Sequence, residues 1–226
     1  NDSLCRMSEI LLEEIPGIKN RLIALSGPSH AEEVSREVPT AVVCSAFKKK
    51  ILCKIQDIFK TSYFRIYTNS DIIGVECGGS LKNIIAIATG ILDGIGLGDN
   101  AKAALMTRGL AEMSRLGEKL GARKSTFAGL SGMGDLIVTC MSKFSRNRAV
   151  GELLGKGKTL KKIMQNMEMV AEGIPTTKSV YVLSKKLKVD MPIVNEVYAI
   201  LFKDKSAKTA VINLMSRSVK SEEEGF

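Results

Sequence analysis

The first seventy residues carry a hydrophobic pattern that switches repeatedly between a strand period and a helix period. Three short runs rich in apolar and β-branched residues have the length of strands: residues 21–28, 40–45 and 64–68. The first run ends in Gly-Pro, which predicts a buried strand followed by a turn. Stretches of helical period lie around the strands: residues 8–14, 31–36 and 48–59. The last stretch has one apolar face: Ile51, Leu52, Ile55 and Phe59. This alternation predicts the C-terminal end of a parallel α/β sheet.

The pattern changes after Asp71, because every periodic stretch beyond this point is helical. Residues 72–92 form one long apolar run, and the next helix is predicted to begin with Asn100 as its N-cap. Further helix starts are indicated by N-cap hydroxyls or by a proline in a first turn: Ser145, Thr159, Pro175, Pro192 and Ser206. We therefore predict a boundary near Ser70, with an α/β remnant at residues 1–70 and an all-α domain at residues 71–226.

The composition is that of an ordinary globular protein, with 45% hydrophobic and 25% charged residues. We expect neither a signal peptide nor a membrane span, because Lys82, Asn83 and Gly90 interrupt the most apolar stretch. The five cysteines are odd in number and lack CxxC spacing, which favours free thiols in a reducing cytoplasm. The single histidine, His30, argues against a metal site.

The formal net charge of +9 has two interpretations. It fits solubility together with a small anionic ligand, or it fits nucleic acid. The lysines are spread along the chain, and aromatic residues make up only 5%, so a base-stacking surface is poorly supplied. The charge pattern therefore favours a small anion and argues against nucleic acid.

The segment Gly-Gly-Ser-Leu-Lys-Asn, which contains Lys82, is the most informative in the chain. A lysine within an otherwise apolar helix is costly to bury unless it is paired or its pKa shifts, and such a lysine can exchange protons near neutral pH. The alternative is that Lys82 lies on the solvent face of an amphipathic helix. This segment alone supports the two interpretations equally.

Two other segments carry candidate binding residues. Ser145, Arg146 and Asn147 place a hydroxyl, free N–H groups and a guanidinium at one helix start, which suits a phosphate, although an ordinary capped surface helix is the simpler interpretation. Asp135 follows a glycine-rich turn that does not have dinucleotide-fingerprint spacing. Its carboxylate could hold a substrate hydroxyl or neutralise Lys82.

The segment Gly-Pro-Ser-His-Ala begins at Gly27 and follows a predicted strand. Ligands of open α/β sheets bind at this end of a strand. His30 could be a general base, but no nearby residue looks like a nucleophile for it to activate, so a packing or surface role is the better interpretation.

Taken together, these motifs point to one family. In chain order they are Gly-Pro-Ser-x-Ala from Gly27, Gly-Val-Glu-x-Gly-Gly-Ser-Leu-Lys-Asn from Gly74, Gly-Leu-Gly-Asp-Asn-Ala-Lys-Ala-Ala-Leu from Gly96, Gly-Met-Gly-Asp-Leu from Gly132, Ser-Arg-Asn-Arg from Ser145 and Val-Ala-Glu-Gly from Val170. Each motif is weak alone. In this order, over nearly the whole chain, they resemble bacterial NAD(P)-dependent glycerol-3-phosphate dehydrogenase.

The resemblance implies a reaction and a set of site residues. The reaction interconverts sn-glycerol 3-phosphate and dihydroxyacetone phosphate, feeds glycerophospholipid synthesis, and uses Lys82 as the acid/base for the C2 hydroxyl. The implied substrate contacts are Gly27, Ser29, Lys82, Asp135, Ser145, Arg146 and Asn147. The implied contacts to NAD or NADP are Ala31, Arg146, Val170 and Glu172. The family resemblance also implies a cytoplasmic enzyme that can form a homodimer and needs no metal.

The sequence departs from the family pattern in two places. His30 stands where the family usually has an aromatic residue such as Phe. More importantly, no GxGxxG motif occurs, so we expect that most of the N-terminal Rossmann domain lies upstream of Asn1 and that this chain alone is inactive. Two alternatives are weighed against the dehydrogenase. A hydroxyacid dehydrogenase would not need the phosphate site, and a non-catalytic helical module would not need Lys82.

Overall fold

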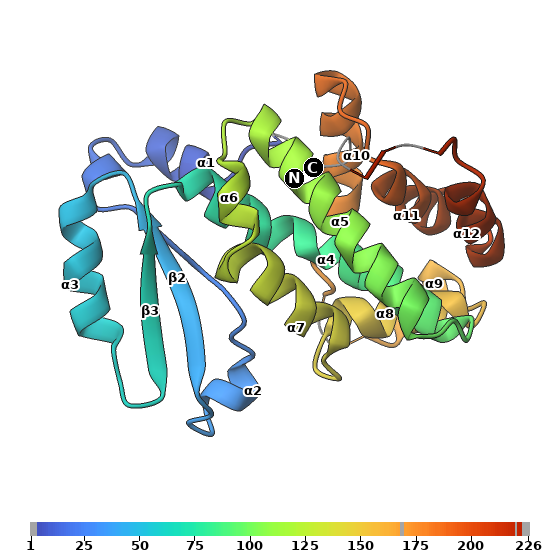
Figure 1. Cartoon of the computed structure of the whole chain (residues 1–226), viewed down its shortest axis with the longest axis horizontal. Coiled ribbons are helices and arrows are strands. Elements are labelled where there is room, and N and C mark those ends of the chain that lie inside the picture. The colour runs from blue at the N-terminus through green and yellow to red at the C-terminus, as the bar shows by residue number, and fades with distance from the viewer. Residues whose placement is uncertain (1–3, 168–169, 220, 223–226) are drawn as a thin grey trace.

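The computed structural model describes residues 4–167, 170–219 and 221–222, which form a small sheet beside a larger helical domain (Figure 1). The elements in chain order are α1 (Met7–Glu14), η1 (Ile18–Asn20), β1 (Ile23–Ser26), α2 (Ala31–Val34), β2 (Thr40–Ala46), α3 (Lys49–Phe59), β3 (Phe64–Asn69), α4 (Ile72–Gly94), α5 (Asp99–Lys119), α6 (Lys124–Phe127), η2 (Leu130–Gly134), α7 (Asp135–Met141), α8 (Arg146–Gly155), α9 (Leu160–Gln165), α10 (Gly173–Leu187), α11 (Pro192–Phe202) and α12 (Ala207–Met215). The predicted order of an α/β remnant followed by helices is confirmed.

The sheet is mixed rather than parallel. Its strand order is β1-β2-β3, and β2 runs parallel to β3, with α3 forming the crossover between them. β1 pairs antiparallel with β2, with Leu25 opposite Cys44, so the prediction of a parallel sheet was wrong for this strand. The connection from β1 to β2 contains only the four-residue α2, which is too short to cover a sheet face as α3 does. β1 was also expected to be buried, but it lies at a sheet edge and Leu25 is 47% exposed.

Helix α3 covers one face of this sheet. Leu52 packs in a small core with Val42, Cys44, Ala46 and Ile66. Ile51 and Ile55 pack against the same core, as their spacing predicts. Phe59 does not follow the pattern, because it is the last residue of α3 and its side chain is 45% exposed where the chain turns towards β3.

Helix α4 is the central element of the helical domain. Fifteen of its 23 residues are buried, against surrounding helices that include α5, α7, α8 and α10. It is long and apolar enough to cross a bilayer by length and composition, so the expectation that no stretch meets this test was wrong. Burial explains its apolar character, because 67% of its most apolar window lies inside the protein.

Glycines allow α4 and α8 to approach closely. A Cβ added to Gly151 on α8 would lie 2.0 Å from the carbonyl oxygen of Ile87, and one added to Gly90 on α4 would lie 2.0 Å from that of Arg148. No larger residue fits either position without moving the backbone. This contact fixes the start of α8 relative to α4.

Most predicted helix starts are confirmed. The hydroxyls of Ser145, Thr159 and Ser206 each accept an N–H from the first turn of their helix. Asn100 was a wrong prediction, because the extended residue before α5 is Gly98 and Asn100 already lies within the helix.

The first turn of α11 is capped by a side chain from another helix. Glu112 on α5 is 1% exposed, and its carboxylate accepts the N–H groups of Ile193 at 2.7 Å and Val194 at 3.2 Å. Burial raises the pKa of Glu112 to about 7, although the two N–H groups oppose this rise.

Candidate active site

Lys82 and Asp135 form an ion pair between α4 and the first residue of α7. The Lys82 ammonium contacts the Oδ1 atom of Asp135, although the two residues are 53 positions apart. The Lys82 side chain is 18% exposed and that of Asp135 is 4% exposed. Lys82 therefore does not lie on a fully solvated helix face, and the possibility that Asp135 neutralises it is realised.

Hydroxyl groups hold the Asp135 carboxylate in place. Thr139 Oγ1 lies 2.6 Å from the main-chain oxygen of Asp135 and 3.3 Å from Oδ1, and Ser26 Oγ donates to Oδ2 at 3.4 Å. Burial raises the pKa of the Asp135 carboxyl, and the Lys82 charge and these hydroxyls oppose that rise. Neither Thr139 nor Ser26 was identified from the sequence. The available signals were the position of Ser26 at a strand end and the i+4 spacing of Thr139 from Asp135.

The paired glycines before Lys82 permit close backbone contacts. A Cβ on Gly78 would lie 2.3 Å from the carbonyl oxygen of Ser131, and one on Gly79 would lie 2.7 Å from Ser26 Oγ. Ser131 belongs to the single-turn π-helix η2, and π-helical turns occur frequently at functional sites. The glycine-rich turn can thus pack on α4 and direct Asp135 towards Lys82.

A cleft of about 470 Å³ opens beside the ion pair, between α1, β1 and α4. Its lining includes Gly27, Ser29, Lys82 and Asp135. Gly27 has φ of +143°, and a Cβ there would lie 2.9 Å from the Cα of Val42, so this position requires glycine. Four of the residues predicted from the sequence therefore line one cleft.

The start of α8 is tied to α4 and α10 through Asn147. The Asn147 side chain donates to Asn83 Oδ1 at 3.0 Å and accepts the N–H of Gly173 at 2.8 Å. Asn83 directly follows Lys82, so this bond holds the helix start near the ion pair. Both ends of the Asn147 amide are used within the protein, which the sequence did not indicate.

The predicted cofactor contacts lie at the surface. Arg146 is exposed, and its guanidinium donates to the carbonyl of Val170 at 3.1 Å, two residues before the exposed Glu172. Ala31 is exposed at the start of α2. The preceding His30 packs edge-on against Phe144, with ring centroids 6.2 Å apart, just before Ser145. Of the packing and surface roles expected for His30, the structure shows the packing role.

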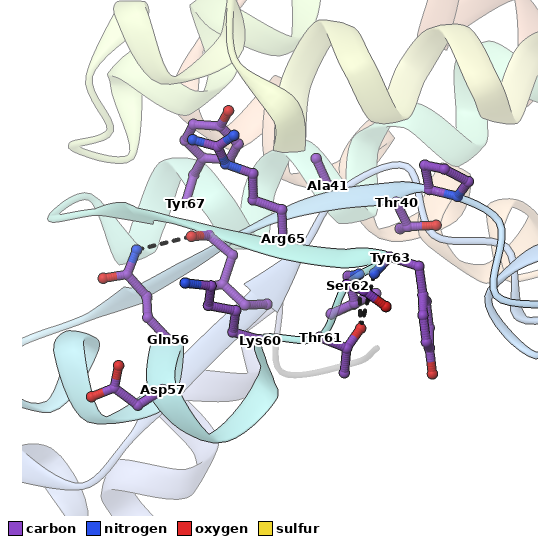
Figure 2. A pocket seen from close by; sticks show the side chains of 13 residues that line it. Thr40, Ala41, Gln56, Asp57, Lys60, Thr61, Ser62, Tyr63, Arg65 and Tyr67 are labelled. Carbon is purple, nitrogen blue, oxygen red and sulfur yellow. Dashed lines mark hydrogen bonds between the residues drawn. The ribbon is translucent and has the colours of Figure 1, made fainter.

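A larger pocket of about 810 Å³ lies at the outer edge of the sheet, lined by the end of α3 and by β3 (Figure 2). Gln56 donates to the carbonyl of Ile66 at 2.9 Å within it, and Lys60 and Arg65 lie nearby. None of the predicted site residues lines this pocket. We therefore place the candidate site at the smaller cleft, where the chemically useful side chains converge.

Comparison with known proteins identifies related sequences over nearly the whole chain. Residues 71–212 match the family model described as NAD-dependent glycerol-3-phosphate dehydrogenase C-terminus, and residues 1–52 match that of the N-terminus. A glycerol-3-phosphate dehydrogenase [NAD(P)+] of Chlorobium chlorochromatii is 57% identical over 218 residues, which is 96% of this chain and 66% of the relative. The Geobacter sp. (strain M21) protein of the same name is 54% identical over 98% of this chain and 66% of its own length.

Solved structures agree with this relationship. The glycerol-3-phosphate dehydrogenase of Coxiella burnetii matches with a TM-score of 0.90 and 39% identity, over 95% of this chain and 66% of that one. The Plasmodium falciparum glycerol-3-phosphate dehydrogenase matches with a TM-score of 0.81 and 25% identity, over 88% of this chain and 58% of that one. The chain thus spans slightly less than two thirds of the length of these relatives.

Proposed function

Because this chain belongs to the NAD-dependent glycerol-3-phosphate dehydrogenase family, we propose that it supplies the substrate-binding and catalytic part of an enzyme that interconverts sn-glycerol 3-phosphate and dihydroxyacetone phosphate. The observation that carries the proposal is the pair formed by Lys82 and Asp135 in the cleft, together with the bond from Asn147 at the start of α8 to Asn83, the residue after Lys82. A hydroxyacid dehydrogenase would not need an anion-binding site at the start of α8. A non-catalytic module would not need the buried ion pair of Lys82 and Asp135.

Lys82 is proposed to move the proton of the reaction. NAD or NADP supplies or accepts the hydride at C2 of the substrate. As the ketone is reduced, negative charge develops on its oxygen, which the Lys82 ammonium stabilises and protonates; in the reverse direction the amine accepts the hydroxyl proton. The Asp135 carboxylate holds the ammonium in the cleft, and Ser26 and Thr139 hold the carboxylate.

The phosphate is proposed to bind at the start of α8. Free N–H groups and the helix dipole favour an anion there, and Arg146 adds a guanidinium. Ser145 is 4% exposed and caps the helix. Because the Asn147 side chain is engaged by Asn83 and Gly173, we propose that Asn147 contributes through its main chain and orients the helix. Gly27 and Ser29, which line the cleft with Lys82 and Asp135, are proposed to complete the substrate contacts.

Arg146, Val170 and Glu172 are proposed to contact NAD or NADP, together with Ala31. The first three form one exposed surface, because the Arg146 guanidinium is bonded to the Val170 carbonyl. An exposed guanidinium at a helix start suits the polyanionic cofactor. The residues present therefore fit this group.

The organisation of the chain supports two further proposals. The separate hydrophobic clusters of the sheet and of the helices support domains at residues 1–70 and 71–226. Since the chain spans 66% of its relatives and lacks a GxGxxG motif, we expect the 226-residue chain alone to show little or no turnover. From the family we further propose a role in glycerophospholipid synthesis, a cytoplasmic location and a homodimeric state.

The decisive experiment restores the upstream residues from a relative and measures kcat and KM with dihydroxyacetone phosphate and with unphosphorylated dihydroxyacetone. Lys82→Ala should lower kcat by about 100-fold or more on both substrates. Arg146→Ala should raise KM for the phosphorylated substrate far more than for the other. Lys124→Ala, which removes an exposed lysine on α6, is the matched control and should change neither.

Two results would overturn the assignment. Full turnover by the Lys82→Ala enzyme would remove the proposed acid/base. An equal effect of Arg146→Ala on both substrates would remove the phosphate role and would restore the hydroxyacid dehydrogenase as the better interpretation.

A further inference from the structure

Helix α3 lies at the end of the molecule opposite α12 (Figure 1). It carries basic residues that the candidate site does not use. The three lysines of α3 are exposed, and so is Lys48, which directly precedes the helix. Helix α3 contains a single acidic residue, Asp57. We define the α3 surface as these residues: Lys19, Phe47, Lys48, Lys49, Lys50, Lys54 and Ile58. It contains five lysines and no arginine.

Large apolar side chains lie among these lysines. Ile58 is 60% exposed and Phe47 is 40% exposed. The Lys19 ammonium lies 5.5 Å from the centre of the Phe47 ring, which brings η1 beside the start of α3. Lys50, Lys54 and Ile58 follow one another at i, i+4 spacing, so an exposed isoleucine continues the row of lysines on one face of α3.

Helix stability does not explain the lysines. Three of them occupy the start of α3, where no acidic side chain lies in the first turn and Lys48 provides no side-chain cap. The partial positive charge of a helix N-terminus is repelled by cations, so this arrangement costs stability. Local features that work against the fold are most often retained for function.

We propose that the α3 surface docks on anionic lipid bilayers, with its lysines over the headgroups and Ile58 and Phe47 in the interfacial layer. Basic residues near an anionic leaflet combined with exposed apolar side chains are the two components of reversible membrane binding. Nucleic acid fits less well, because phosphate recognition favours the bidentate guanidinium of arginine and gains nothing from Ile58. The proposal does not depend on dehydrogenase activity.

Sedimentation of the 226-residue chain with vesicles tests the proposal. Vesicles of phosphatidylcholine with phosphatidylglycerol should bind the chain, and pure phosphatidylcholine vesicles should not. Each lysine near an anionic surface contributes about fivefold to partitioning, so the triple variant Lys49→Gln, Lys50→Gln, Lys54→Gln should bind about 100-fold more weakly. Ile58→Ser should weaken binding by roughly tenfold.

The matched control removes three exposed lysines from the helical domain: Lys161→Gln, Lys178→Gln and Lys208→Gln. It has the same change in net charge and should keep nearly full binding, because these residues lie outside the α3 surface. Equal losses in the two triple variants would show a general effect of net charge and would overturn the proposal. So would binding to neutral vesicles, unchanged binding of Ile58→Ser, or binding to single-stranded RNA in place of anionic vesicles. Circular dichroism of each variant confirms that it is folded.

Discussion

The contact between α4 and α8 can be tested by one added methyl group. In Gly151→Ala the new Cβ would lie 2.0 Å from the carbonyl oxygen of Ile87 and 2.9 Å from the nitrogen of Ile91. Because an ordinary carbon–oxygen contact needs about 3.3 Å, the two backbones must separate by about 1.3 Å. Both obstructing atoms belong to the main chain of a helix, so a side-chain rotation cannot relieve the contact.

Three contributions set the change that Gly151→Ala makes in the free energy of unfolding. Overpacking of a tight contact costs about 2–3 kcal/mol when backbone must move. Alanine gains about 1 kcal/mol over glycine within a helix. The separation also loosens the hydrogen bond between Asn147 and Asn83, worth about 1 kcal/mol. We therefore expect Gly151→Ala to lower the free energy of unfolding by about 2–3 kcal/mol.

Urea denaturation followed by circular dichroism measures this loss on the 226-residue chain, without need for activity. The midpoint should fall by about 1 M with little change in slope. Gly134→Ala is the control, because Gly134 has helical φ and ψ and its added Cβ would meet nothing nearer than 3.6 Å. That variant should match or exceed the unmodified chain by up to about 1 kcal/mol. If Gly151→Ala unfolds at the same urea concentration as the unmodified chain or above it, the close approach of α4 and α8 is refuted.

Three further predictions concern buried carboxyl groups. Asp71→Ala should lower the free energy of unfolding by about 2–4 kcal/mol in urea, because it removes the N-cap of α4 and strands the buried Thr126 hydroxyl; a loss below about 0.5 kcal/mol would contradict this. Burial raises the pKa of Glu112 from 4.5 to about 7, so its contribution to stability is complete below pH 4.5 and is lost as the pH rises through about 7. Unfolding measured against pH should show this decline, and its persistence in Glu112→Gln would refute the assignment. Asp135→Asn should lower the free energy of unfolding at neutral pH by about 2–3 kcal/mol, because it leaves the largely buried Lys82 ammonium without its charged partner; an unchanged free energy of unfolding would show that the pair does not stabilise the fold.

Local patterns determined most of the secondary structure. Hydrophobic period and chain length place α3, α4 and α5, because one face of each helix must be buried whatever its neighbours are. Hydroxyl caps mark the starts of α8, α9 and α12, because the cap hydrogen bond is made within four residues of sequence. The ordered motifs also identify the family without any structure.

Long-range pairing was not encoded in these local patterns. The antiparallel direction of β1 depends on how the chain returns to β2, and the apolar run of β1 is compatible with either direction. Asn100 has the chemistry of an N-cap, but the backbone is extended at Gly98 and already helical from Asp99, so Gly98 is the N-cap of α5. Glu112 looks like a surface residue of α5 until α11 is placed with its first turn against it.

The candidate site shows the same division. The sequence alone named Lys82 and Asp135 as polar residues in unusual surroundings, because an ammonium within an apolar helix and a carboxylate after a glycine-rich turn both conflict with their local pattern. Only the tertiary structure brought them into contact, added the Ser26 hydroxyl, and engaged the Asn147 amide between α4 and α10. The physical reason is that the preference of a segment for helix or strand is set by residues close in sequence. The ion pair and the burial of a side chain depend on which distant helix packs against it.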